Sequence, residues 1–185
     1  MANLKPNKMK DTAFENWLAG LFGQSEHEVE RLLGDKNAVQ FLIAWSLFES
    51  RCFSGFVRTE EIQDFSERLT DIENFDAPSI SEYAHHFHAR YKGDKTLYRN
   101  LMHKQKCKKL DAILNSSVQE LTPTEIVFLS TFVVYRFRNN IFHGNKEVNS
   151  WLKFTEQIAH CISILQQFVS HAEAIKCTLK SIEPV

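Results

Sequence analysis

Apolar residues recur at helical spacing from the first part of the chain. Those between positions 14 and 22 lie three or four residues apart, which places them on one face of a helix. Ser25 and Glu28 have the spacing of a capping box ahead of a second amphipathic stretch, and Gly34 follows that stretch as a stop signal. The pattern therefore predicts an N-terminal helical extension over residues 1–36.

The rest of the chain shows a series of further helical patterns. Residues 37–54 are apolar on nearly every side of a helix, which predicts that this segment lies at the centre of the fold. The later patterns cover residues 59–69, 80–92, 95–115 and 122–143, and a last amphipathic helix begins near Trp151. Together they predict an all-α fold, a single compact helical bundle over residues 37–185.

The clearest local signal is the start of the fifth of these helices. Thr122 is a typical N-cap, Pro123 suits the first helical position, and Glu125 has the spacing to reach back to the cap. The apolar run that follows ends at His143, where Gly144 suits a left-handed closing residue. These start and stop signals predict a helix from about residue 122 to residue 143.

Composition agrees with helices and excludes several functional classes. The 185 residues include only six glycines and four prolines, too few for the turns of a sandwich or barrel, and no glycine-rich phosphate loop is present. The four cysteines have no CxxC spacing, which favours reduced thiols in a cytoplasmic protein. The first ten residues lack an apolar core, and the longest apolar stretch is too short for a bilayer, so neither a signal peptide nor a membrane partner is expected.

Charge is balanced overall but uneven along the chain. The net charge is −1, whereas residues 59–76 contain seven acidic residues against one arginine and residues 91–110 contain seven basic residues against one aspartate. The basic stretch, with Lys104 and Lys108, suits contact with an RNA backbone, and two tyrosines within it (Tyr91 and Tyr98) suit stacking on bases. The alternative is that the tyrosines pack inward while the lysines are solvated.

Polar residues gather at the end of the helix over 122–143, which is otherwise hydrophobic. Arg136, Asn139 and His143 lie within one stripe at about 100° per residue, and Asn139 could orient the His143 imidazole from four residues away. Arg138 lies about 140° around the helix from His143, which makes a site shared between two chains worth considering. An arginine fork and a histidine suit a phosphodiester substrate, and a polar helix end is the alternative.

Histidines elsewhere in the chain are candidate ligands for a metal ion. His85, His88, His103 and Cys107 have a spacing from which a zinc site can be drawn. The His-x-x-His spacing recurs by chance in a chain with eight histidines, so a solvated or hydrogen-bonded helix face is favoured. We therefore expect no metal site and no cofactor, and His160 is interpreted as part of the polar side of the last helix.

The run Arg138-Asn139-Asn140-Ile141-Phe142-His143-Gly144 resembles the signature of the HEPN superfamily: an arginine, a polar residue, and a histidine four to six positions after the arginine. The resemblance extends to Lys146, to the amphipathic helix from Trp151, and to the apolar helix that contains Trp45 and Glu49. It covers roughly residues 37–56 and 122–175. It implies an all-α bundle of the HEPN type.

The resemblance also implies a metal-independent endoribonuclease that works as a homodimer, leaves a 2′,3′-cyclic phosphate, and acts in phage defence or as a toxin. In that reading His143 activates the 2′-hydroxyl or protonates the leaving oxygen, and Arg138 stabilises charge on the transition state. Asn139 orients the site, and Glu49 matches an acidic residue of some family members. The RNA contacts expected beside them are Arg136, Asn140, Lys146, Lys104 and Lys108.

Other family members act differently. Some HEPN domains have lost nuclease activity and bind nucleotides or other proteins, so a catalytically silent module is the alternative function. A cognate inhibitor or a defence-system partner protein is a further partner that the resemblance implies. Two-gene toxins of the family carry a tyrosine two residues after the histidine, where this chain has Asn145.

Overall fold

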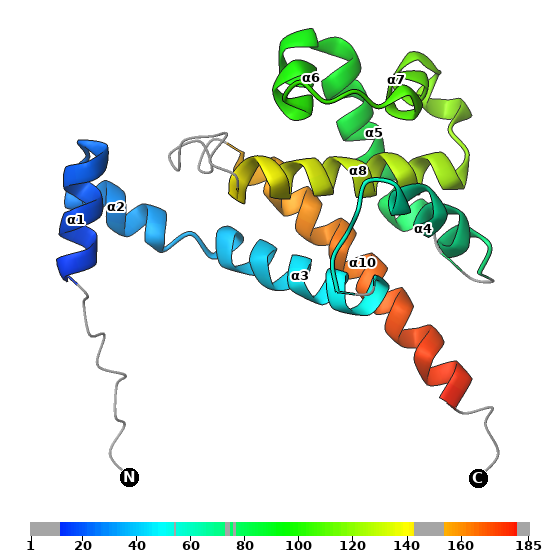
Figure 1. Ribbon diagram of the computed structural model, residues 1–185, viewed down its shortest axis with the longest axis horizontal. Coiled ribbons are helices and arrows are strands. Elements are labelled where there is room, and N and C mark those ends of the chain that lie inside the picture. Colours follow the sequence, from blue (N-terminus) through cyan, green and yellow to red (C-terminus); the bar gives the residue numbers. More distant parts are fainter. Residues whose placement is uncertain (1–11, 54, 73–74, 76, 143–153, 181–185) are drawn as a thin grey trace. The chain divides into compact units, whose positions relative to one another are not determined.

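The chain folds into helices joined by short turns. The computed structural model describes residues 12–53, 55–72, 75, 77–142 and 154–180 (Figure 1). In chain order the helices are α1 (Thr12–Phe22), α2 (Glu26–Leu33), α3 (Lys36–Cys52), α4 (Glu61–Thr70), α5 (Pro78–Gly93), α6 (Lys95–Met102), α7 (Lys108–Asn115), the short 3-10 helix η1 (Val118–Glu120), α8 (Pro123–Phe142) and α10 (Thr155–Lys180). The described residues contain no strand, which confirms the all-α fold class.

The chain divides into two compact units, residues 1–36 and residues 37–185. The boundary coincides with the one drawn from the sequence. In the first unit, α1 ends at Gly23, whose φ of +61° suits a residue without a Cβ. The α2 capping box is confirmed: the Glu28 amide donates to Ser25 Oγ at 3.3 Å, and the Ser25 amide donates to the Glu28 carboxylate at 3.0 Å.

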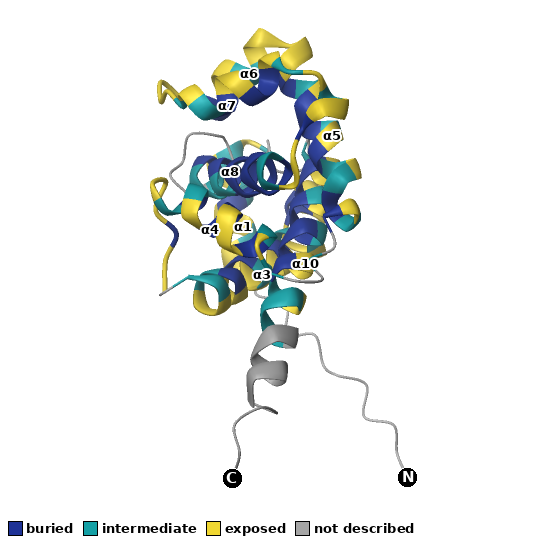
Figure 2. Cartoon of the chain, turned by 90° about the vertical axis from the view of Figure 1, so that its right-hand side faces the viewer, coloured by how far each residue is buried: buried dark blue, intermediate teal, exposed yellow. Residues whose placement is uncertain are grey.

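The central helix of the second unit is α8. Helices α4, α5, α6, α7 and α10 all pack against it, and every residue from Ile126 to Val134 is buried (Figure 2). Its predicted start is confirmed, because the Glu125 amide donates to Thr122 Oγ1 at 3.3 Å and the Thr122 amide donates to the Glu125 carboxylate at 2.9 Å. A helix that is apolar on all sides is stable here because neighbours cover all its sides.

Aromatic rings join three of the outer helices. Phe48 of α3, Phe65 of α4 and Phe168 of α10 meet with ring centroids 5.5 to 5.8 Å apart, a spacing typical of favourable aromatic pairs. Phe48 and Phe168 are completely buried. This cluster fixes the C-terminal half of α3 to the bundle.

The prediction that α3 lies at the centre of the fold is wrong. Phe41, Trp45 and Phe48 are buried along one face. The apolar side chains on its other face are 42% to 56% exposed: Val39, Leu42, Ile43 and Leu47. Periodicity reports how apolar residues are distributed around a helix but does not report which faces have neighbours, and α8 takes the central position instead.

The basic segment over residues 95–115 forms two helices rather than one. His103 and Lys104 have φ values of +43° and +69°, a left-handed conformation that ends α6 before α7 begins. Neither residue is a glycine, so nothing in the sequence marks this break.

Three cysteine side chains and the lengths of the helices are given by the described part of the chain. Cys161 is buried, Cys52 and Cys107 are partly buried, and all three are free thiols. Within the described ranges, no helix combines the length and the apolar character needed to cross a bilayer.

Candidate functional site

The C-terminal end of α8 holds Arg138 in a defined position against α3. The Arg138 guanidinium lies over the Trp45 ring, 5.6 Å from its centroid, and Nη1 donates to Asn139 Oδ1 at 3.0 Å. Tyr135, one turn earlier, has its ring 6.4 Å from the same indole, and its hydroxyl accepts a hydrogen bond from Thr59 Oγ1 at 3.2 Å. Arg138 and Asn139 are both partly buried, so this corner is still partly open to solvent.

Two of the predicted site residues, His143 and Lys146, lie outside the described residues. α8 ends at Phe142, so His143 follows the last helical residue directly in the chain. The expected hydrogen bond between Asn139 and His143 therefore stays a prediction. What the structure does give for the Asn139 side chain is a hydrogen bond that its Oδ1 accepts from Arg138 Nη1 at 3.0 Å.

Arg136 points away from this corner and is bound inside the protein. Its Nε donates to the Leu101 carbonyl at 3.1 Å, Nη2 to the Met102 carbonyl at 2.9 Å and Nη1 to Gln105 Oε1 at 2.8 Å. The last carbonyls of a helix lack hydrogen-bond donors within that helix, and the Arg136 guanidinium supplies such donors at the end of α6. Only 3% of Arg136 is exposed, so its donors fasten α6 to α8 and are not presented to an RNA phosphate.

Asn140 has a similar structural role. Its side chain donates to the Leu101 carbonyl at 3.0 Å and to the Asn100 carbonyl at 3.3 Å, and only 2% of the residue is exposed. The expectation that Arg136 and Asn140 contact RNA therefore conflicts with their burial. Both are polar residues near the end of an apolar helix, and the sequence alone does not show that carbonyls at the end of α6 accept hydrogen bonds from them.

Glu49 lies near the end of α3 and is partly buried. Its carboxylate accepts a hydrogen bond from the Val57 amide at 3.3 Å, and its backbone carbonyl accepts one from the Gly55 amide at 3.3 Å. Gly55 has a φ of +110°, which a residue with a Cβ rarely adopts. The contacts of Glu49 thus close the turn that leads the chain out of α3.

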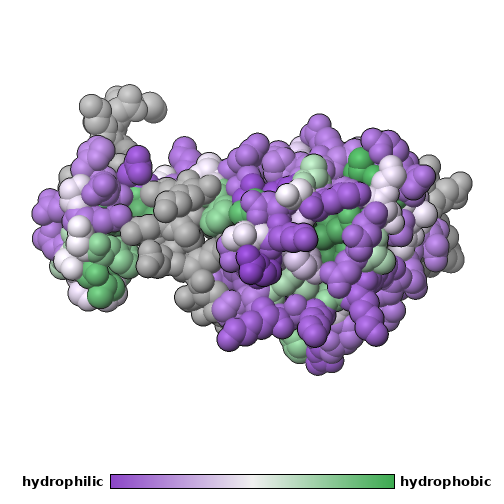
Figure 3. All heavy atoms as spheres, turned by 90° about the horizontal axis from the view of Figure 1, so that it is seen from above, coloured by the Kyte–Doolittle hydropathy of each residue, from purple (hydrophilic) through white to green (hydrophobic). Residues whose placement is uncertain are grey.

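The basic segment presents lysines to solvent and packs its tyrosines against the core, Tyr91 fully and Tyr98 partly. Lys104 and Lys108 are exposed. The view from above Figure 1 shows a surface that is mainly hydrophilic over the second unit (Figure 3). Tyr91 is only 5% exposed, and the Tyr98 hydroxyl donates to the Asp111 carboxylate. Of the two readings of this segment, the structure favours tyrosines that pack inward, so stacking on bases has no support from their positions.

The acidic segment borders a groove between the end of α3 and α4. This groove has a volume of about 710 Å³ and is lined by four carboxylates, those of Glu61, Asp64 and Glu67 in α4 and that of Asp71 directly after it. Arg51 and Arg68 also line it. The excess of negative charge makes this face unsuitable for an RNA backbone, which leaves the end of α8 and the α6–α7 lysines as the basic surface.

The histidines gather differently from the arrangement considered in the sequence. His88 is buried, and its Nε2 lies 3.1 Å from the Ile113 carbonyl, so it is a hydrogen-bonded core residue. Among the described residues, the group that could hold a metal ion is His86, Glu156 and His160. Burial and the nearby His160 lower the pKa of His86. The sequence analysis missed this group, although Glu156 and His160 have the i, i+4 spacing of one helix face.

Comparisons with known proteins give no further assignment. The chain matches no family model, no curated protein and no solved structure. Any functional conclusion therefore depends on the residues themselves.

Proposed function

We propose that this chain is a metal-independent endoribonuclease of the HEPN type, in which Arg138 and His143 act on the RNA phosphodiester. The observation that carries the proposal is the position of Arg138 at the end of the central helix, held on the Trp45 ring and bonded to Asn139. Its neighbour Arg136 is used entirely within the fold. Of these two arginines, Arg138 is the one that a substrate can reach.

The contacts of Arg138 suit stabilisation of a phosphorane-like transition state. A guanidinium offers a planar fork that matches two phosphate oxygens, and contact with the Trp45 indole restricts where that fork lies before the substrate arrives. Because the guanidinium loses less orientational freedom when the phosphate binds, more of the binding free energy is available to stabilise the transition state. Asn139 holds Nη1 from the side and serves as a positioning residue.

His143 supplies the proton transfer in this proposal. It takes the proton from the 2′-hydroxyl as that oxygen attacks phosphorus, or gives one to the departing 5′-oxygen, and a 2′,3′-cyclic phosphate and a 5′-hydroxyl result. The protein works as a homodimer, in which the Arg138 and His143 side chains of the two copies face each other in one catalytic cleft. Lys104 and Lys108 contribute sequence-independent contacts to the RNA backbone. The proposal includes a role in phage defence or as a toxin. It also includes inhibition of the nuclease by a cognate partner protein.

Cleavage of a structured RNA in EDTA tests the proposal. The wild type is compared with Arg138→Ala and His143→Ala, and we expect both variants to lose at least about 100-fold in rate, as removal of a transition-state donor does. Arg58→Ala is the matched control, because Arg58 also lies over an aromatic ring, that of Phe56, at 4.8 Å. Its rate should equal that of the wild type, and the products should carry 2′,3′-cyclic phosphate ends.

Two outcomes would contradict this function. Equal cleavage by all variants would indicate a contaminating nuclease, and cleavage only after addition of a divalent metal would exclude the metal-independent reaction. An inactive wild type would favour the catalytically silent alternative. The exposed apolar face of α3 is the observation that favours a protein partner in that case.

A further inference from the structure

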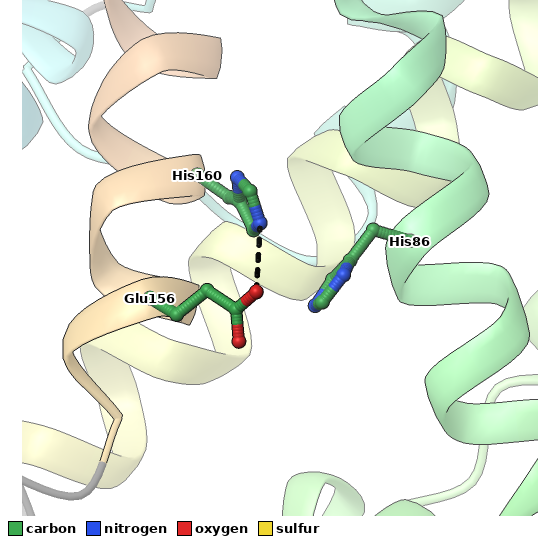
Figure 4. Close-up of side chains that lie close together, drawn as sticks. All are labelled: His86, Glu156 and His160. Atoms are coloured by element: carbon green, nitrogen blue, oxygen red, sulfur yellow. Dashed lines mark ion pairs between the residues drawn. The ribbon is translucent and has the colours of Figure 1, made fainter.

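Helices α5 and α10 pack against each other and bring three potential metal ligands together. His86 comes from α5, and Glu156 and His160 come from consecutive turns of α10 (Figure 4). The ligand atoms of the three side chains all lie within 4.8 Å of one another. His160 Nε2 is 3.9 Å from Glu156 Oε1, and the two imidazole rings have centroids 4.5 Å apart. Figure 4 shows all three side chains pointing into the same space between the helices.

One atom of this group lacks a partner in the described part of the chain. His86 Nε2 is buried and makes no hydrogen bond there. Leaving a buried polar atom without a partner is unfavourable, so such atoms are rare in native proteins and call for an explanation. His88, two residues later on α5, shows the ordinary solution, a hydrogen bond to a backbone carbonyl. His86 instead faces another imidazole and a carboxylate.

We propose that His86, Glu156 and His160 form a binding site for a divalent transition-metal ion of the zinc type. Two imidazole nitrogens and one carboxylate oxygen are a donor set that Zn²⁺ prefers, with a fourth position left for water. Mg²⁺ and Ca²⁺ prefer oxygen donors alone, so the two histidines select against them. The ion would take the place of the hydrogen bond that His86 lacks.

The geometry allows the three ligands to close on one ion. Two ligand atoms at about 2.1 Å from a tetrahedral ion lie about 3.4 Å apart, and the ligand atoms here lie within 4.8 Å, so the most distant pair must approach by up to about 1.4 Å. Glu156 is exposed and both histidines are partly exposed, so small rotations of their side chains are sterically open. Arg90, one turn after His86, interacts electrostatically with it and opposes a cation, while the Glu156 charge favours one.

Such an ion would join two helices of the bundle. It would fasten the first turns of α10 to the middle of α5, next to the aromatic contact in which Phe137 of α8 lies 6.0 Å from Phe154 and 6.2 Å from Phe87. It takes no part in the proposed RNA cleavage, and the inference does not depend on that function.

Titration of chelator-stripped full-length protein with Zn²⁺ alone tests the site by calorimetry. We expect one ion per chain, and at least about 10-fold weaker binding in Glu156→Gln and His160→Ala, because loss of a ligand costs no less than loss of an outer-shell partner. His85→Ala is the matched control, since His85 is the exposed histidine next to His86 on the same helix. It should bind Zn²⁺ as the wild type does.

Folding and activity are followed in the same samples. Glu156 is exposed, so Glu156→Gln keeps the fold, and its far-ultraviolet circular dichroism should match the wild type. Zn²⁺ should raise the melting temperature of the wild type and His85→Ala but not of Glu156→Gln. RNA cleavage by Glu156→Gln should equal that of the wild type, which separates this site from the proposed reaction. Absence of stoichiometric binding to the wild type, or equal binding by all variants, would overturn the proposal.

Discussion

Two arginines separated by one residue on α8 have different environments. Arg136 makes three hydrogen bonds to the end of α6 and is buried, whereas Arg138 lies partly exposed over Trp45. Two steps along a helix turn a side chain by about 200°, so neighbours of this kind face opposite sides. At this scale the identity of a residue does not reveal its role, because the role depends on what the facing helix provides.

Replacement of Arg136 by methionine should destabilise the protein rather than change an RNA contact. The change removes three hydrogen bonds from a charged donor, although the Leu101 carbonyl keeps its bond from Asn140 and the Met102 carbonyl keeps its bond from the Gln105 amide. We expect the free energy of unfolding in urea to fall by about 3 kcal/mol. Arg99→Met, at an exposed position of α6, should change it by less than about 0.5 kcal/mol. A loss of under about 1 kcal/mol for Arg136→Met would contradict the structural role.

Cys161 should resist thiol reagents in the native protein. Burial raises the pKa of its thiol, and the thiolate is the reactive form, so both access and ionisation protect it. Cys107 is partly exposed and serves as the internal comparison. Maleimide labelling followed by peptide mass spectrometry should find Cys107 modified and Cys161 unmodified until urea unfolds the chain. Equal labelling rates in native buffer would show that α10 opens locally.

The sequence predicts features that depend on near neighbours in the chain. The capping box of Thr122 and Glu125 is confirmed because its partners are three residues apart and the chemistry is local. The partners of Arg136 are more than thirty residues away, and His86 and His160 are further apart still. No periodicity reports such pairs, so the burial of Arg136 and the histidine pair became visible only in the folded chain.

At the scale of elements, α3 and α8 have similar apolar composition and different surroundings. α8 is covered by α4, α5, α6, α7 and α10 and also contacts α3 at Trp45, whereas α3 has one buried face and one exposed apolar face. The sequence predicts both helices and does not rank them, because hydrophobic periodicity carries no information on packing partners. Likewise the break between α6 and α7 rests on the left-handed backbone of His103 and Lys104, which local residue preferences do not favour.

The two faces of α3 should respond differently to substitution. Phe48 is fully buried against Phe65 and Phe168, so Phe48→Ala should cost about 3–5 kcal/mol of unfolding free energy. Leu47 is 42% exposed, so Leu47→Gln should change it by less than about 0.5 kcal/mol. Urea unfolding at low protein concentration measures both. A loss for Leu47→Gln comparable to that of Phe48→Ala would show that another surface covers this face.

At the scale of the whole molecule, the chain consists of two units that differ in their means of stabilisation. The continuous apolar core of the second unit begins at Phe41 and ends at Phe168, and it includes no described residue of the first unit. The first unit contains two short helices with few buried apolar side chains. Small units bury a smaller share of their surface, so the free energy of folding must reside mainly in residues 37–185.

Removal of residues 1–34 should therefore leave a stable domain. The truncated chain keeps Asp35 ahead of α3 and retains the whole apolar core. We expect one cooperative calorimetric transition, with equal calorimetric and van't Hoff enthalpies and a melting temperature within about 4 °C of the full-length protein, which corresponds to a change of about 1 kcal/mol. A lost transition, or a fall of more than about 10 °C, would mean that the extension supplies part of the core. A stable truncated domain would also allow RNA cleavage and Zn²⁺ binding to be measured without the first unit, and both should persist because all residues assigned to them follow position 36.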